Sequence, residues 1–197
     1  MFTSFSGLVA SISTGQYESA ILLTKSKSES INLACVPIAL ATLVSFYLLL
    51  LTGFLKENYS YGLRTYTQFI QLLLIGTVVN SAYQSLYYLQ LKDGHYKRIS
   101  ISKVLYSISN ISCSIFLAFT DEIAHKLIFA LLIGRTASLF FLLLSFLKNS
   151  LPIIGFIKPK KILKIIKQYK DFPMYSMPQA LTDSFRDNAL NMLISST

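Results

Sequence analysis

Tryptophan is absent from this chain of 197 residues, and cysteine, proline and glycine are scarce, at two, five and eight residues. So few prolines and glycines exclude a disordered or loop-rich chain, and most of the sequence is therefore expected to be helix. Cys35 and Cys113 both lie inside apolar runs and have no neighbour at metal-ligand or CxxC spacing. They are expected to pack as small hydrophobic residues.

The motifs of soluble enzymes are also missing. The sequence contains no phosphate-binding P-loop, no GxGxxG, no HExxH and no GxSxG. His95 lies in a basic connection and His125 in a short one, and neither is near a carboxylate cluster, so both are expected at the surface. We therefore predict that the chain is not an enzyme and that it needs no cofactor or metal.

Hydrophobic residues dominate what is present. They make up 53% of the chain, charged residues make up only 14%, and the mean hydropathy of +0.53 indicates a membrane protein. Lys and Arg outnumber Asp and Glu by 18 to 9. In a soluble protein this excess would favour nucleic acid as a partner, but here the basic residues gather between apolar runs, so no nucleic acid is expected.

A spanning helix needs about 20 mostly apolar residues, and several runs reach that length. Five candidate spans precede residue 150 and a sixth runs to the end of the sequence: 2–23, 31–54, 69–91, 101–119, 123–146 and 174–197. The sequence therefore predicts an all-α membrane protein, a polytopic bundle of about six transmembrane helices.

Basic residues between these runs predict the orientation, because Lys and Arg are retained on the cytoplasmic side. Segments 24–30, 92–103 and 147–170 hold thirteen of the eighteen, whereas 55–68 and 120–126 hold three. This alternation places Met1 on the outer side. We therefore expect a further helix before residue 1, and the apolar run that is unfinished at Thr197 predicts a fragment of a longer protein.

Segment 148–172 has a different pattern and divides the chain. Ile162, Ile166 and Tyr169 share one helical face, and lysines occupy the other. This favours an amphipathic helix on the inner leaflet that attracts anionic membrane lipids, and a solvated linker is the alternative. The predicted domains are a first bundle, 1–147, a basic cytoplasmic linker, 148–172, and the truncated first helix of a second bundle, 173–197.

An acidic side chain, Glu18, lies near the end of the first candidate span. Gly7, Ser11, Gly15 and Ser19 recur there every four residues, which favours close approach of another helix. A continuous helix would place Glu18 near this small-residue face, inside the protein and near the cytoplasmic boundary. Glu18 is predicted either to form an ion pair or to belong to the mouth of a cavity.

Polar stripes also mark the later spans. In the third and fourth spans the stripes consist of Gly76, Asn80, Gln84 and Tyr88, and of Lys103, Ser107, Asn110 and Ser114. Arg135 lies near the middle of the fifth span, where an unpaired charge costs about 2.5 to 3.5 kcal/mol or more. The stripes predict a shared polar cavity, whereas Tyr87, Tyr88 and Tyr96 fit an aromatic belt near the inner boundary.

Charges occupy one face of the last candidate helix as well. Asp183, Arg186 and Asp187 lie on the same side as Gln179 and Asn191. Two interpretations remain for the charges inside the spans. They either order the helices as ion pairs or line a substrate path.

Three stretches together resemble a known family. "GQYESAILLTKS", "NSAYQSLYYLQLKDGHYKRISISKVL" and "KDFPMYSMPQALTDSFRDNALNMLIS" are similar to the polysaccharide biosynthesis proteins, the oligosaccharide flippases of O-antigen and capsule pathways. These belong to one superfamily with the multidrug and toxin extrusion transporters. The resemblance implies two six-helix halves, of which this chain would supply helices two to six, the joining segment and the start of the second half.

The resemblance also implies a substrate, an oligosaccharide linked through pyrophosphate to a polyprenyl lipid and flipped across the bacterial cytoplasmic membrane. Polysaccharide polymerase and chain-length proteins are the partners that it implies. The substrate-binding residues expected on this basis are Arg135, Asn80, Gln84, Asn110 and Arg186. The residues expected to couple transport to a cation gradient, or to form ion pairs, are Glu18, Asp183 and Asp187.

Other functions remain open at the level of sequence. A cation-coupled multidrug or small-molecule antiporter of the same superfamily would favour a compact acidic site over a cationic cavity. A membrane glycosyltransferase or O-antigen polymerase needs long charged outer loops, which are absent here, and a membrane assembly factor is a further alternative.

Overall fold

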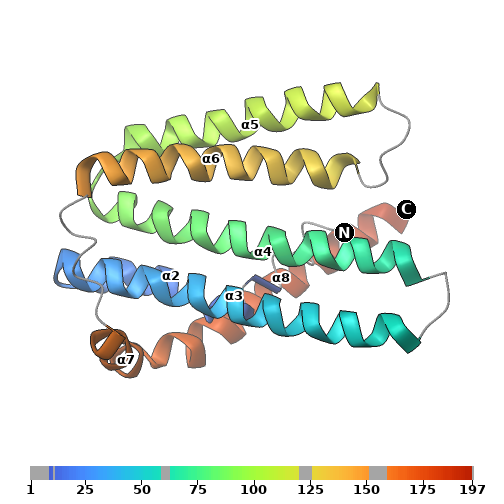
Figure 1. The fold of residues 1–197 in the computed structure, drawn as a ribbon. Helices are drawn as coiled ribbons and strands as arrows, with labels where there is room; N and C mark the ends of the chain where they lie inside the picture. The colour runs from blue at the N-terminus through green and yellow to red at the C-terminus, as the bar shows by residue number, and fades with distance from the viewer. Residues whose placement is uncertain (1–8, 11, 59–62, 120–125, 151–158, 197) are drawn as a thin grey trace.

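The computed structural model describes residues 9–10, 12–58, 63–119, 126–150 and 159–196. Within these ranges every regular element is helical, and no strand occurs (Figure 1). The elements are α2 (Tyr17–Ala20), the 3-10 helix η1 (Ile21–Leu23), α3 (Lys27–Asn58), α4 (Leu63–Lys92), α5 (Tyr96–Ala118), α6 (Lys126–Ser150), α7 (Pro159–Gln168) and α8 (Asp171–Ser196). The prediction of an all-α chain is confirmed.

Four long helices run side by side, and each runs in the direction opposite to the long helix before it in the sequence (Figure 1). In Figure 1 they follow one another across the bundle in the order α3, α4, α6 and α5. Each contains a segment that is long and apolar enough to cross a membrane: Lys27–Leu51, Phe69–Lys92, Tyr96–Ala118 and Lys126–Lys148. These four segments correspond to the second to fifth predicted spans. The described residues therefore contain four candidate transmembrane helices, where about six were predicted.

The first predicted span is not a continuous helix. Residues 12–14 are helical, but Gly15 and Gln16 both have a φ of 58°, and the chain becomes helical again only at Tyr17. Two successive residues in the left-handed region end an α-helix, because a right-handed helix needs negative φ throughout. The small-residue face predicted from a continuous helix is therefore wrong, and Gly7 and Ser11 lie outside the described residues.

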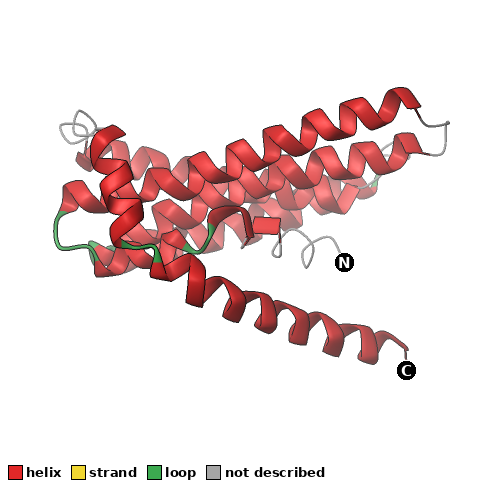
Figure 2. Ribbon diagram, turned by 90° about the horizontal axis from the view of Figure 1, so that it is seen from below, coloured by secondary structure: helices red, strands yellow, loops and turns green. Residues whose placement is uncertain are grey.

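Helix α8 has the length of a span but is not among the four candidate membrane segments. Figure 2 shows α8 leaving the bundle at an angle, so that its C-terminal part stands away from α3 to α6. Its N-terminal end packs against the chain near α2, where Pro173 lies 3.5 Å from the position that a Cβ on Gly15 would occupy. Its first turn is thus tied to the break in the N-terminal segment.

Helix α7 crosses the end of the bundle that carries the connections from η1 to α3 and from α4 to α5 (Figure 1). The predicted amphipathic pattern is present, and its apolar side chains contact the core of the protein. Ile165 is 5% exposed and belongs to the same apolar cluster as Ile21, Ile31 and Leu86, with Ile162 packed against it. The apolar face of α7 therefore packs on α3, and its location on the inner leaflet stays a prediction.

Hydroxyl groups join the long helices inside the bundle. The Ser45 hydroxyl of α3 lies 3.1 Å from the Thr77 hydroxyl of α4, and the Ser138 hydroxyl of α6 donates to the Ser102 carbonyl of α5. Small hydroxyl residues allow helices to approach closely and satisfy each other's polar groups where water is scarce. These contacts fix the relative positions of the helices that carry the candidate site.

Candidate functional site

A polar groove lies where α4, α5 and α6 meet. Its volume is about 270 Å3, and its lining consists of Tyr83, Gln84 and Tyr87 of α4, Lys103 and Tyr106 of α5, and Arg135 of α6. The spacing of these residues explains the convergence. Tyr83 and Tyr87 are four residues apart on α4, and Lys103 and Tyr106 are three apart on α5, so each pair lies on one face of its helix and faces the groove.

Arg135 lies between two tyrosine rings in this groove. Its guanidinium carbon is 4.5 Å from the centre of the Tyr83 ring and 5.1 Å from the centre of the Tyr106 ring. Such cation–π contacts stabilise a cation by about 0.5 to 2 kcal/mol, and more as water is removed. Within the described ranges no carboxylate forms an ion pair with Arg135. The two rings consequently hold the guanidinium in place, while no carboxylate of the described residues balances its charge.

A second cation shares the groove. The Lys103 ammonium lies 5.3 Å from the centre of the Tyr87 ring. Tyr87 in turn stacks with Tyr83 at a centroid distance of 6.2 Å and meets Tyr88 edge-on at 5.5 Å. The wall of α4 is therefore a row of aromatic rings facing two positive charges, an arrangement suited to an anion that carries flat, hydroxyl-bearing groups.

Sequence reasoning missed two of the tyrosines in this site. Tyr83 and Tyr106 had no predicted role, and Tyr87 was expected to be an interfacial anchor. The recurrence of Tyr83 and Tyr87 four residues apart, with Gln84 beside them, was the available signal. It did not reveal that Arg135 of another helix would face those rings, because that depends on how α4 packs on α6.

Gly134 brings α5 and α6 close together beside Arg135. A Cβ at this position would lie 3.1 Å from the Cβ of Asn110 and 3.1 Å from the carbonyl oxygen of Tyr106. Only glycine permits this approach without displacement of a neighbour. Because the backbones of α5 and α6 are close here, the Tyr106 ring can contact the Arg135 guanidinium.

The predicted substrate-binding residues fall into three groups. Arg135 and Gln84 line the groove together. Asn110 instead packs near Gly134 between α5 and α6, and Asn80 lies outside the lining with its Oδ1 buried and without a hydrogen bond. Arg186 is exposed on α8 and is not part of the lining either.

The charges of α8 form a local pair. The Arg186 guanidinium lies 3.7 Å from the Asp183 carboxylate, three residues earlier on the same helix, and both side chains are more than half exposed. This pair lies within α8 and joins no second helix, so the two interpretations of Asp183, an ion pair that orders the helices or a residue of a substrate path, both stay predictions. The side chain of Asp187 lies outside the described residues.

Glu18 occupies a different environment, beyond the four candidate membrane segments. It is 8% exposed, and its Oε1 accepts a hydrogen bond of 3.1 Å from the Thr14 hydroxyl. Its Oε2 is buried and has no hydrogen-bond partner, and no basic side chain of the described residues pairs with it. Burial raises the pKa of this carboxyl group, against a smaller lowering by its own backbone N–H and by Thr14.

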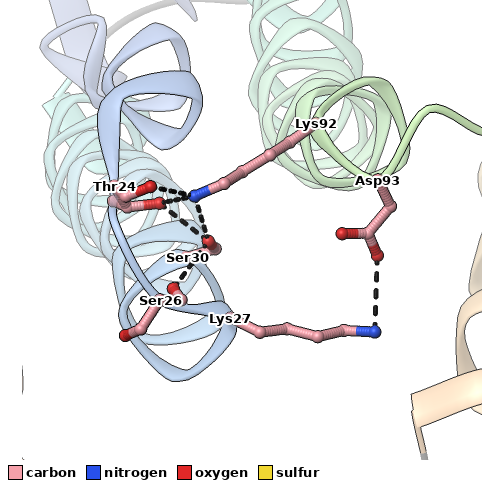
Figure 3. A network of polar contacts seen from close by, with 6 residues as sticks. All are labelled: Thr24, Ser26, Lys27, Ser30, Lys92 and Asp93. Carbon is pink, nitrogen blue, oxygen red and sulfur yellow. Dashed lines mark hydrogen bonds and ion pairs between the residues drawn. The ribbon is translucent and has the colours of Figure 1, made fainter.

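A polar network that the sequence did not suggest closes the end of the bundle near α2. The Lys92 ammonium donates to the carbonyl and hydroxyl oxygens of Thr24 and, at 2.8 Å, to the Ser30 hydroxyl (Figure 3). Beside it, Lys27 and Asp93 form an ion pair of 3.5 Å. These contacts connect the turn between η1 and α3 to the end of α4.

Comparison with known proteins does not assign this chain to a family. No protein-family model, no curated protein and no solved structure matches this chain. Among the described residues there is also no cluster of His, Cys, Asp or Glu able to hold a metal ion.

Proposed function

We propose that the chain is part of a flippase for polyprenyl-pyrophosphate-linked oligosaccharide repeat units. Such a protein would turn the sugar headgroup from the cytoplasmic to the outer face of the bacterial cytoplasmic membrane, for O-antigen, capsular or exopolysaccharide biosynthesis. The four apolar helices of the described residues are consistent with a location in a membrane. The nature of the transported headgroup is inferred from the groove.

The observation that carries this proposal is the half-buried charge of Arg135, with which no carboxylate of the described residues forms an ion pair. A guanidinium that contacts two tyrosine rings, and no carboxylate of the described residues, offers planar, paired N–H donors to a phosphate. Lys103 supplies a second positive charge in the same groove, which suits a diphosphate better than a single carboxylate. The net charge of the lining is positive, so an anionic ligand is favoured over a cationic one.

The aromatic and amide groups of the groove support the sugar part of the substrate. Tyrosine rings present flat apolar surfaces beside hydroxyl groups, and the Gln84 amide can both donate and accept hydrogen bonds. Alternating access, in which two halves of a transporter rock around a fixed site, would carry the headgroup across without contact with lipid tails. In this proposal α3 to α6 belong to the first half and α8 begins the second.

The test removes the guanidinium in cells that carry the gene in its natural setting. Arg135→Ala is expected to abolish surface polysaccharide while lipid-linked repeat units accumulate on the cytoplasmic side. Lys97→Ala, which removes an exposed cation at the start of α5, is the matched control and should leave both quantities unchanged. Membrane levels of both variants are measured by immunoblot.

Two outcomes would contradict the proposal. Normal surface polysaccharide in cells with stable Arg135→Ala protein would show that the guanidinium does not hold the transported headgroup. Increased drug sensitivity without a polysaccharide defect would instead favour the multidrug or small-molecule antiporter of the same superfamily.

A further inference from the structure

The groove lies where two pairs of helices meet. Within the first pair, the Ser45 hydroxyl of α3 donates to the Leu74 carbonyl of α4 at 3.3 Å, and within the second the Ser138 hydroxyl of α6 donates to the Ser102 carbonyl of α5. The lining of the groove comes from α4 of the first pair and from α5 and α6 of the second. A contact across the groove therefore joins two helix pairs, each of which has hydrogen bonds of its own.

One contact across the groove involves Lys103. Its ammonium, on α5, lies 5.3 Å from the centre of the Tyr87 ring of α4. Among the described residues this ammonium forms no ion pair with a carboxylate. The ring attracts the positive charge, but an ammonium group has three N–H donors that a ring face does not satisfy as oxygen atoms would. The cation is therefore held in place while its donors remain available to an anion.

The ring in this contact is fixed more firmly than the cation. Tyr87 stacks with Tyr83, meets Tyr88 edge-on and packs against the apolar cluster of the bundle. Lys103 is exposed, and its charge stands on a flexible four-carbon stem. Separation of the two groups is therefore expected to come from movement of Lys103, which leaves the ring in place with its face uncovered.

Arg135 differs from Lys103 in this respect. It is half-buried and contacts two rings, one of which, Tyr83, is only 4% exposed. A planar guanidinium can stay in contact with aromatic rings while its N–H groups bind a phosphate. Of the two cations in the groove, Lys103 is therefore the one that changes its partner when a ligand binds.

We propose that Tyr87 is a placeholder for the ligand. Its ring holds the Lys103 ammonium until a phosphate group takes that cation, and the uncovered ring then stacks on the sugar that the phosphate carries. A charge-assisted hydrogen bond to phosphate is stronger than the contact of a cation with a partly exposed ring, so the exchange favours the phosphate. This role rests on the proposed function, because it takes a diphosphate-linked sugar as the ligand.

The exchange makes Tyr87 a residue that determines specificity. An anion without a sugar must separate Lys103 from the ring and makes no new contact with that ring. A diphosphate that carries a sugar replaces the lost contact by stacking on the ring. The groove is thus expected to favour a sugar-linked diphosphate over inorganic phosphate or diphosphate.

Binding of inorganic diphosphate to the full chain in detergent tests this role, because this probe has no sugar. Tyr87→Leu removes the ring but leaves both cations, so we expect diphosphate to bind about 2- to 5-fold more tightly, the range that corresponds to an exposed cation–π contact. Tyr87→Phe retains the ring and should bind less tightly than Tyr87→Leu. Tyr96→Leu, which removes an exposed tyrosine outside the lining, is the matched control and should bind as the wild-type chain does. Isothermal titration calorimetry measures each affinity.

Two further titrations separate the contact with the cation from the contact with the sugar. In a Lys103→Gln background, Tyr87→Leu should no longer tighten the binding of inorganic diphosphate, because the ring then holds no cation. With a hexosyl diphosphate as the probe, Tyr87→Leu should bind no more tightly than the wild-type chain, since the loss of stacking offsets the gain.

Fluorescence reports the exchange directly. The chain has no tryptophan, so Tyr87→Trp supplies a single indole in the position of the ring that holds Lys103. Its emission should change as diphosphate removes the ammonium from its face, with the same midpoint as the calorimetric titration of that variant.

The proposal is overturned if inorganic diphosphate binds Tyr87→Leu no more tightly than the wild-type chain, or if the gain persists after Lys103→Gln. It is equally overturned if hexosyl diphosphate shows the same gain, if the indole emission stays constant at saturating diphosphate, or if the wild-type chain binds no diphosphate. The flippase proposal fails by a different result, normal surface polysaccharide in cells with stable Arg135→Ala protein. The two failures are therefore distinguishable.

Discussion

The basic side chains of the α3 to α6 bundle and those on the surface of α8 have different surroundings. Arg135 contacts Tyr83 and Tyr106 and pairs with no carboxylate of the described residues, and Lys92, at the end of the bundle, donates to three oxygen atoms. On α8, Arg186 is exposed and lies beside Asp183. A cation whose charge the protein neutralises locally is not available to a ligand, whereas a cation held only by aromatic rings is. Enclosure without a counter-charge therefore separates a binding residue from a surface ion pair.

The largest effect on stability is expected where a cation bridges two parts of the bundle. Lys92→Met should lower the free energy of unfolding by about 2 kcal/mol, because charge-assisted hydrogen bonds contribute about 1.5 to 3 kcal/mol. Lys27→Met removes only an exposed ion pair and should cost less than about 1 kcal/mol. Chemical unfolding of both variants in the same detergent measures the difference. Equal losses would show that the network around Lys92 is no stronger than a surface pair.

Replacement of arginine by lysine should weaken ligand binding in the groove but not on α8. Arg135→Lys retains the charge but loses the planar stacking on two rings and the paired donors, so we expect affinity for an anionic headgroup to fall by about 1 to 2 kcal/mol. The corresponding change on α8, Arg186→Lys, should alter affinity by less than about 0.5 kcal/mol. Titration with a soluble diphosphate-linked sugar gives both values. A larger effect at Arg186 would move the proposed site to α8.

A comparison of a tightly packed glycine, Gly134, with an open one, Gly53, tests the packing that positions Arg135. Gly134→Ala places a methyl group 3.1 Å from Asn110 and from the Tyr106 carbonyl, so α5 and α6 must separate at a cost of about 1 kcal/mol or more. Gly53→Ala, on α3, meets nothing within 4 Å and should be neutral or stabilising, because alanine favours the helix. Unfolding measurements on the two variants make this comparison. Loss of ligand affinity is expected only for Gly134→Ala.

The four long helices could be predicted from the sequence because hydropathy and length suffice to identify them. The apolar runs at 31–54 and 69–91, for example, lie within the helices Lys27–Asn58 and Leu63–Lys92. The break at Gly15 and Gln16 could not be predicted, since hydropathy carries no information on backbone angles and both residues lie in a run of suitable composition. The expectation of one continuous helix through this stretch is wrong for this reason.

The candidate site was predictable only in part, for a related reason. Arg135 and Gln84 were identified because charged and amide groups are costly among apolar residues. The roles of Tyr83 and Tyr106 depend on which faces of α4, α5 and α6 meet, and tyrosine is common enough in membrane helices to give no signal alone. That Asn110 lies outside the lining of the groove could not be predicted, because a stripe on one helix does not show whether a groove or a neighbouring helix covers it.

The smallest change in the free energy of unfolding is expected from the exposed ion pair of α8. Asp183→Asn removes the carboxylate beside Arg186, and since both side chains are more than half exposed, the free energy of unfolding should change by less than about 0.5 kcal/mol. Chemical unfolding at low and high salt measures this, and the small difference from the wild-type chain should shrink as salt is added, because exposed charges are screened. A loss that exceeds about 1 kcal/mol and persists at high salt would mean that α8 covers this pair against another surface. In that case Asp183 and Arg186 would be enclosed charges like Arg135, and the distinction between the two regions would fail.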